Sequence, residues 1–267
     1  MTYIPLGYAD LAIAALLVLI NAGLSLALRL GLEGRLVLAA VRMVAQLLLV
    51  GLILQGLFAV ASPWLTLLAA LVMVAFAAHE IRARQARPLT GAWTHGLGGG
   101  AMLLAGTAAT LLALTTQIQP DPWHDPRFAL PLLGMILGNA MTGVSIGLDR
   151  LLTGVVRERA AIEARLALGH TRAQALSGPL REAFRAGLIP VINSMSAAGI
   201  VFLPGMMTGQ ILSGTPPVEA VKYQILVMFL IAGATGLGVL VALLGGARRL
   251  SDPRHRLRLD RLAPDKG

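Results

Sequence analysis

Polar side chains within long apolar stretches are the first candidates for chemistry in this sequence. Arg42 and Gln46 lie four residues apart, about one helical turn, and Asn139 and Asn193 lie in two further apolar stretches. Polar groups in hydrocarbon are costly and often functional, so these four residues are candidates to line a solute path. For Arg42 the alternative is a side chain that snorkels to the membrane surface. For the two asparagines it is hydrogen bonding between helices.

A second set of candidates follows Leu203 and Pro204. Met206, Met207 and Gln210 lie in a glycine-rich run, which argues against a plain helix. Broken helices at membrane depth are tolerated where they line a cavity, so we predict that these three residues line an outer gate or pathway. Thioethers suit soft ions such as Cu(I), whereas iron favours His, carboxylate or thiolate ligands. The metal ligands are therefore unknown from the residues, and most methionines are expected to be core packing.

Catalytic machinery is missing from the sequence. A phosphate-binding loop needs a lysine in a glycine-rich loop, and neither Lys222 nor Lys266 lies in one. A membrane enzyme would need His with Asp or Glu inside the apolar stretches, but the histidines lie at edges or in loops, at His79, His95, His124, His170 and His255. We expect no catalytic residues and no cofactor in this chain. Transport would be passive or powered by ATP in a partner subunit.

Composition identifies the class of protein that must position these residues. Hydrophobic residues make up 56% of the 267 residues and charged residues only 13%, against roughly 25% in soluble domains. The net charge of +9 comes from basic residues that lie between apolar stretches. This arrangement indicates orientation in a lipid bilayer rather than binding to nucleic acid.

The apolar stretches predict an all-α, polytopic bundle of about seven transmembrane helices. Each is long enough, or nearly so, to cross about 30 Å of hydrocarbon. The break between the second and third is set by Pro63, which lacks an N–H and disfavours helix in the residue before it. The predicted spans cover residues 11–28, 36–61, 64–78, 97–118, 128–148, 186–207 and 223–247.

The basic residues predict the orientation. With the N-terminus outside and the C-terminus in the cytoplasm, 19 of the 22 Lys and Arg residues fall on the cytoplasmic side, where such residues are enriched. We therefore expect one membrane domain over residues 1–250 and a basic cytoplasmic tail over residues 251–267. That tail is expected to lie on the anionic inner leaflet or to be disordered.

Residues 150–186 between the fifth and sixth spans are long for a connection and predict cytoplasmic helices. An amphipathic helix over residues 155–168 is stopped by Gly169, and Thr171 with Gln174 has the spacing of a capping box. A further turn at residues 177–179 leads into the next helix. A rigid set of cytoplasmic helices of this kind would let a soluble partner push on the membrane domain. The alternative is an amphipathic helix lying on the bilayer.

Two motifs resemble known transport proteins. The run EARLALG at residues 163–169 resembles the docking loop of ABC transporter permeases, although Arg165 stands where a second Ala is usual and Ile189-Pro190 comes late. The run PGMMTGQILSG at residues 204–214, with IPVINSM before it and YQI after it, resembles the FetB family of iron-export ABC permeases, which includes plant aluminium-tolerance proteins. Arg42 with Gln46 is similar to the same family.

The resemblance implies a multi-pass permease of the bacterial inner membrane. It implies a homodimer paired with soluble ATPase subunits and the export of iron or a related metal. The residues expected to couple to the ATPase are Glu163, Ala164, Leu168, Gly169, His170 and Thr171. The alternative is a stand-alone channel or secondary carrier for a small solute, which flux without an ATPase would establish.

Overall fold

The computed structural model describes residues 7–264, and the chain over this range is helical with no β-strand. The predicted all-α class is therefore confirmed. The chain forms two compact units, which divide between Ala61 and Ser62. Each unit is described here by itself.

The first unit is a helical hairpin of α1 (Tyr8–Ala27) and α2 (Glu33–Val60). The Ser25 hydroxyl closes the turn between them by donating a hydrogen bond to Glu33 Oε2 at 2.8 Å and accepting one from the Leu32 N–H at 3.0 Å. Nearly all other side chains of the two helices are apolar and exposed within the unit. Such a surface belongs in lipid or against other membrane helices.

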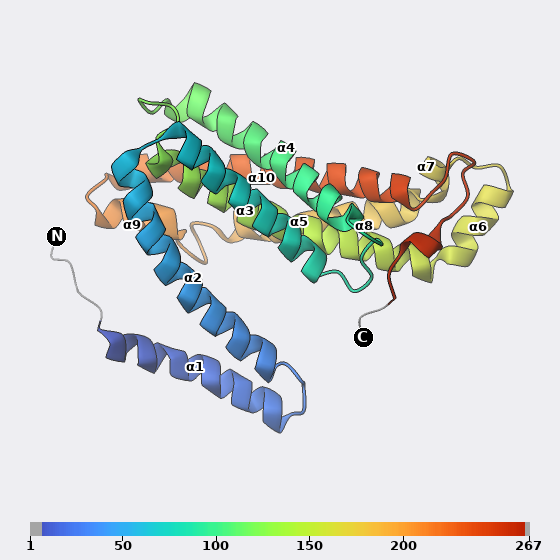
Figure 1. The fold of residues 1–267 in the computed structure, drawn as a ribbon, viewed down its shortest axis with the longest axis horizontal. Helices are drawn as coiled ribbons and strands as arrows, with labels where there is room; N and C mark the ends of the chain where they lie inside the picture. The colour runs from blue at the N-terminus through green and yellow to red at the C-terminus, as the bar shows by residue number, and fades with distance from the viewer. Residues whose placement is uncertain (1–6, 265–267) are drawn as a thin grey trace. The chain divides into compact units, whose positions relative to one another are not determined.

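The second unit is a bundle built around α5 (Pro126–Arg157). This helix packs against all four other long helices of the unit (Figure 1), which are α3 (Pro63–Ala83), α4 (Trp93–Leu112), α8 (Ser177–Ala197) and α10 (Pro217–Arg249). A π-helical turn, η1 (Ala113–Ile118), extends α4. With 32 and 33 residues, α5 and α10 are each about 50 Å long and exceed the hydrocarbon thickness, so their ends extend beyond it.

Two glycines allow the close crossing of α5 and α8. A Cβ atom at Gly143 would lie 2.7 Å from the Gly187 carbonyl oxygen, and one at Gly187 would lie 2.9 Å from the Gly143 carbonyl oxygen. At Gly147 a Cβ would approach the Ala183 carbonyl oxygen to 3.3 Å. Gly143 and Gly147 lie four residues apart on α5, and small residues at this spacing permit backbone contact between helices. Both glycines are therefore explained by packing within the chain.

The helices differ from the predicted spans in two places. Six helices within the described residues are long and apolar enough to cross a membrane, and α8 is not among them, so the count of seven stays a prediction. The predicted span over residues 186–207 is wrong in its bounds. The helix α8 begins earlier, at Ser177, and ends at Ala197, and α9 (Gly205–Leu212) follows a non-helical connection that contains Pro204. The chain is non-helical at Leu203-Pro204, as predicted, but the expectation that the glycine-rich run after them is not a plain helix is wrong, because that run forms α9.

Three short helices gather at one end of the bundle, beyond the C-terminal end of α5. They are α6 (Arg159–Ala167), α7 (Arg172–Ala175) and the 3-10 helix η2 (Leu259–Arg261). Figure 1 shows α6 and α7 at this end and α9 towards the opposite end. The fifth span was predicted to end at residue 148, but α5 continues to Arg157 and carries the chain directly into α6.

Candidate functional site

The six predicted coupling residues lie in the second half of α6, at Glu163 and Ala164, and on the turn that joins α6 to α7, at residues 168–171. All six, Glu163, Ala164, Leu168, Gly169, His170 and Thr171, are exposed. Leu168 is 79% exposed. Glu163 Oε1 lies 2.8 Å from Arg159 Nε, but this ion pair is itself open to solvent and contributes only about 0–1 kcal/mol. The turn therefore offers an apolar side chain and a carboxylate to a partner.

The local sequence explains why the chain turns here. Gly169 has a φ of +88°, a left-handed conformation that ends α6 and that other residues rarely adopt. Thr171 then begins α7 with the predicted capping box, in which its N–H donates to Gln174 Oε1 at 2.9 Å and its hydroxyl accepts from the Gln174 N–H at 3.4 Å. The predicted helix stop and capping box are both confirmed.

The opposite side of this helical pair is fixed to the bundle. We call residues 159–175 the elbow. Ile162 is 1% exposed and Ala175 is fully buried, and both belong to the same core cluster as Leu152 and Val155 of α5. Within the elbow, Arg165 Nη1 donates to the Ala175 carbonyl oxygen at 3.4 Å. The elbow therefore projects from the bundle with one face packed on the bundle core and the other face exposed.

Charged groups link the two bundle helices that flank the elbow. Glu182 at the start of α8 pairs with Arg150 of α5 and lies 3.5 Å from Arg157, at the end of the same helix. Hydrogen bonding to Glu158, with the charge of Glu182 beside it, raises the pKa of the Arg157 guanidinium. A hollow of about 570 Å³ opens beside the elbow, and its lining includes Arg165 and Arg181. The surroundings of the elbow are thus strongly basic.

The predicted pathway residues lie in both units. Arg42 and Gln46 belong to α2 in the first unit. In the second unit, Asn139 Nδ2 donates to the Met135 carbonyl oxygen of its own helix at 2.8 Å, so its amide is not used for a bond between helices. Asn193 is exposed on α8.

The residues of the predicted gate lie on α9, which packs against α10. Met207 is only 9% exposed, and Met206 packs against the core cluster that contains Val227 and Ile231. Gln210 carries a buried Oε1 atom that has no hydrogen-bond partner within the described chain. The methionines serve packing here, and the role of these residues in a gate stays a prediction.

Sequence reasoning missed an anchor between α3 and α5. The buried Gln85 Nε2 donates to the carbonyl oxygens of Ile81 and Ser145, each at 3.1 Å, and the Ala86 N–H donates to Asp149 Oδ1 at 2.8 Å. Asp149 is the first acidic residue after a long apolar stretch, and that position was the one available signal. Within residues 7–264, no three His, Cys, Asp or Glu side chains come together as a metal-binding group.

The fold and these sites define the class: this is a multi-pass membrane protein whose bundle carries an exposed helical elbow at one end. The chain belongs to the uncharacterised protein family UPF0014, whose family model matches residues 8–251. The family that the sequence motifs indicated is thereby confirmed.

Three relatives show what the family contains. The UPF0014 membrane protein slr1647 of Synechocystis is 41% identical over 76% of this chain and 77% of its own length. The "Probable iron export permease protein FetB" of Escherichia coli is 34% identical over 93% of both chains. The protein ALUMINUM SENSITIVE 3 of Arabidopsis thaliana is 34% identical over 85% of this chain and 81% of its own. No solved structure gives a significant match.

Proposed function

We propose that this chain is the membrane-spanning permease subunit of an ABC transporter, powered by a separate ATPase that docks on the elbow. The observation that carries the proposal is the two-sided elbow, with Glu163 and Leu168 exposed and Ile162 buried in the bundle core. A partner that pushes on the exposed turn would move α5 and α8, which the elbow joins. The chain itself would hydrolyse no ATP.

The distribution of basic residues supports a cytoplasmic elbow. The end of α3, the elbow and the end of α10 meet at one end of the bundle. This end is rich in arginine, at the end of α3 (Arg82), in the elbow (Arg159, Arg165 and Arg172) and at the end of α10 (Arg248 and Arg249). Lys and Arg are enriched on the cytoplasmic side of membrane proteins. We infer that this end faces the cytoplasm, that α8 completes a set of seven spans, and that the N-terminus lies outside.

The proposed cargo is iron or a related metal, leaving the cytoplasm of a bacterial cell through its inner membrane. Similarity over 93% of the length of an Escherichia coli protein named for iron export supports this cargo. The proposed assembly is a homodimer of permeases with two ATPase subunits, in the manner of ABC transporters. Arg42, Gln46 and Gln210 stay candidates for the pathway.

The docking claim is tested with charge reversal on the elbow. Purified permease is reconstituted with a candidate soluble ABC ATPase, and ATP hydrolysis is measured with and without permease. We expect Glu163→Lys and Gly169→Pro to abolish stimulation of the ATPase while the permease still inserts. The matched control is Glu219→Lys, because Glu219 is equally exposed and ion-paired, at 2.8 Å from Lys222, but lies at the start of α10.

Stimulation at the wild-type level in both elbow variants would refute the proposal. Equal loss in the Glu219→Lys control would also count against it, because the effect would then come from charge reversal in general.

A further inference from the structure

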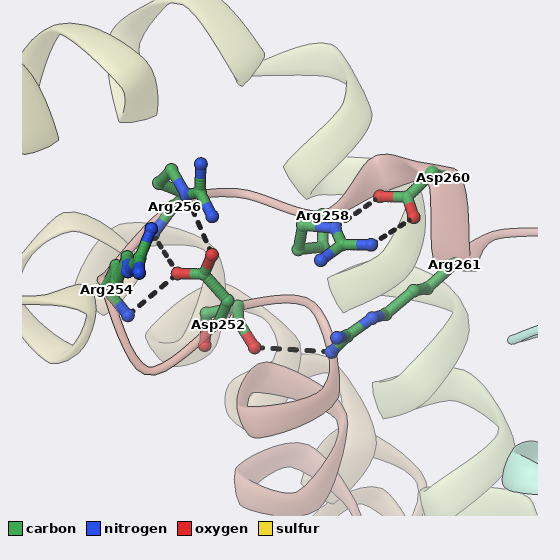
Figure 2. Close-up of polar contacts among 7 residues, drawn as sticks. Asp252, Arg254, Arg256, Arg258, Asp260 and Arg261 are labelled. Atoms are coloured by element: carbon green, nitrogen blue, oxygen red, sulfur yellow. Dashed lines mark hydrogen bonds and ion pairs between the residues drawn. The ribbon is translucent and has the colours of Figure 1, made fainter.

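The C-terminal segment is folded against the bundle rather than free. We call residues 251–263 the clasp. It begins with a turn in which Asp252 Oδ1 accepts hydrogen bonds from the N–H groups of Arg254 at 2.9 Å and Arg256 at 2.8 Å (Figure 2). Asp252 Oδ2 accepts a further bond from Arg256 Nε at 2.8 Å. Of the two expected states of the tail, disorder is therefore wrong for these residues, and a position on the inner leaflet stays a prediction.

The clasp is tied to the end of α10. Arg261 Nη1 donates to the carbonyl oxygen of Arg249 at 2.8 Å, and the Arg258 N–H donates to that of Leu250 at 2.9 Å. The guanidinium of Arg258 forms a two-pronged pair with Asp260, with both distances at 2.8 Å, as Figure 2 shows. Such paired, charge-assisted bonds fix geometry as well as attract.

The far end of the clasp pairs with the connection between α3 and α4. Leu262 forms an antiparallel bridge with Leu89, flanked by bonds from the Thr90 N–H to the Arg261 carbonyl oxygen at 2.9 Å and from the Ala263 N–H to the Pro88 carbonyl oxygen at 2.8 Å. Leu89 is 1% exposed and lies in the core cluster that also holds Ile162 of the elbow. Three leucines of the clasp pack on this cluster, at Leu257, Leu259 and Leu262.

The turn of the clasp touches the elbow itself. His255 Nδ1 accepts a hydrogen bond from the Arg172 N–H at 3.3 Å, the first residue of α7. His255 has a φ of +58°, a conformation that costs a non-glycine residue energy and marks a constrained position. A hollow of about 370 Å³ separates the same turn from α6, with Glu163 and Leu166 on one wall and His255 and Leu257 on the other.

We propose that the clasp holds the elbow in register with α10 and the α3–α4 connection, and that His255 is its positioning residue. The inference rests on the proposed function, because it assigns the clasp a part in transmitting the push of the ATPase. The elbow is joined covalently only to α5 and α8. Through the clasp, a displacement of α7 also reaches α10 and the connection from α3 to α4.

The contact is tested without any ATPase by hydrogen–deuterium exchange of the full chain in lipid nanodiscs. We expect His255→Ala to speed exchange at residues 170–175 about fivefold, the effect of losing one hydrogen bond. His255→Asn should restore slow exchange, because Asn offers an acceptor oxygen and tolerates the left-handed conformation. His255→Gly should resemble Ala, since Gly relieves the backbone but removes the acceptor. His124→Ala is the control.

Coupling is tested in the complex with the same candidate ATPase. We expect His255→Ala to lower permease-stimulated ATP hydrolysis several-fold and His255→Asn to recover it. Unchanged exchange in His255→Ala would overturn the contact, and faster exchange with unchanged stimulation would overturn the positioning role. If the wild-type permease stimulates no ATPase, the proposed function fails and the coupling role of the clasp fails with it, whereas the exchange results still decide the contact.

Discussion

Glycine contacts decide the helix crossing at the centre of the bundle. Gly143 of α5 faces Gly187 of α8, and Thr235 Cγ2 of α10 would lie 2.7 Å from a Cβ added at Gly143. Because backbone atoms form one wall of this contact, the space cannot open by a simple side-chain rotation. The residues that set the distance between α5 and α8 are thus among the smallest in the chain.

At Gly143 we predict that Ala destabilises the protein by about 1–3 kcal/mol through overpacking. The melting temperature in detergent should fall by about 5 °C, the shift expected for a chain of this size. The control is Gly138→Ala on the same helix, where nothing lies within 4 Å of an added Cβ. Equal melting temperatures for the two variants would show that the crossing is looser than described.

At the scale of elements, the clasp is held by two carboxylates whose pKa values are lowered by their hydrogen bonds. The Arg256 N–H bonded to Asp252 holds the pKa of that carboxyl below its ordinary value of 3.8. Hydrogen bonding from Arg258 lowers the pKa of Asp260 from 3.8 to about 2. Because both pKa values are depressed on folding, both carboxylates stabilise the clasp above their ordinary pKa and lose this effect as the pH falls through the folded-state value, which is about 2 for Asp260.

We therefore predict that peptides covering residues 253–257 keep the same protection from hydrogen exchange at pH 7 and pH 5, after correction for intrinsic rates. Asp252→Ala removes the acceptor for the Arg254 and Arg256 N–H groups and should raise exchange at both values. Asp260→Ala should leave these amides protected, because Asp260 pairs only with Arg258. The comparison is repeated in His255→Asn, because protonation of the His255 ring would remove its bond from the Arg172 N–H. A fall in protection between pH 7 and pH 5 in that variant would contradict the assignment.

The sequence predicted elements that carry local signals. Uninterrupted apolar runs located most of the long helices. Pro63 located the start of α3, and Gly169 and Thr171 located the turn between the short helices α6 and α7, because each of these residue types acts on its own backbone. Hydropathy failed where α5 runs on through Asp149 and Arg150, since helical hydrogen bonds need no apolar side chains. The clasp was missed because its pairing partner, Leu89, lies far away in sequence and leaves no local pattern.

The same difference between local and long-range signals decided which parts of the candidate site could be predicted. The coupling residues were predicted from a contiguous motif, and the structure exposes all six on the end of α6 and the turn that follows it. The pathway candidates are scattered through the sequence, and a path forms only from the packing of helices on one another. Polar type alone therefore could not reveal that Asn139 bonds within its own helix at 2.8 Å.

At the scale of the whole molecule, both ends of the bundle carry residues suited to labelling. The chain has no cysteine, so single cysteines can report orientation in intact cells. We predict that Glu219→Cys reacts with a membrane-impermeant maleimide from outside. Leu168→Cys should react only after the membrane is opened. Labelling of Leu168→Cys in sealed cells would reverse the proposed orientation and remove the elbow from the reach of a cytoplasmic ATPase.

The central claim is that a separate ATPase powers this permease. The most direct measurement is the movement of radioactive iron in proteoliposomes that contain the permease with or without the candidate ATPase, each with and without MgATP. We expect movement only when the ATPase and MgATP are both present, and we expect Glu163→Lys to abolish it. Movement at the same rate with the permease alone would contradict the account and identify a stand-alone channel or carrier.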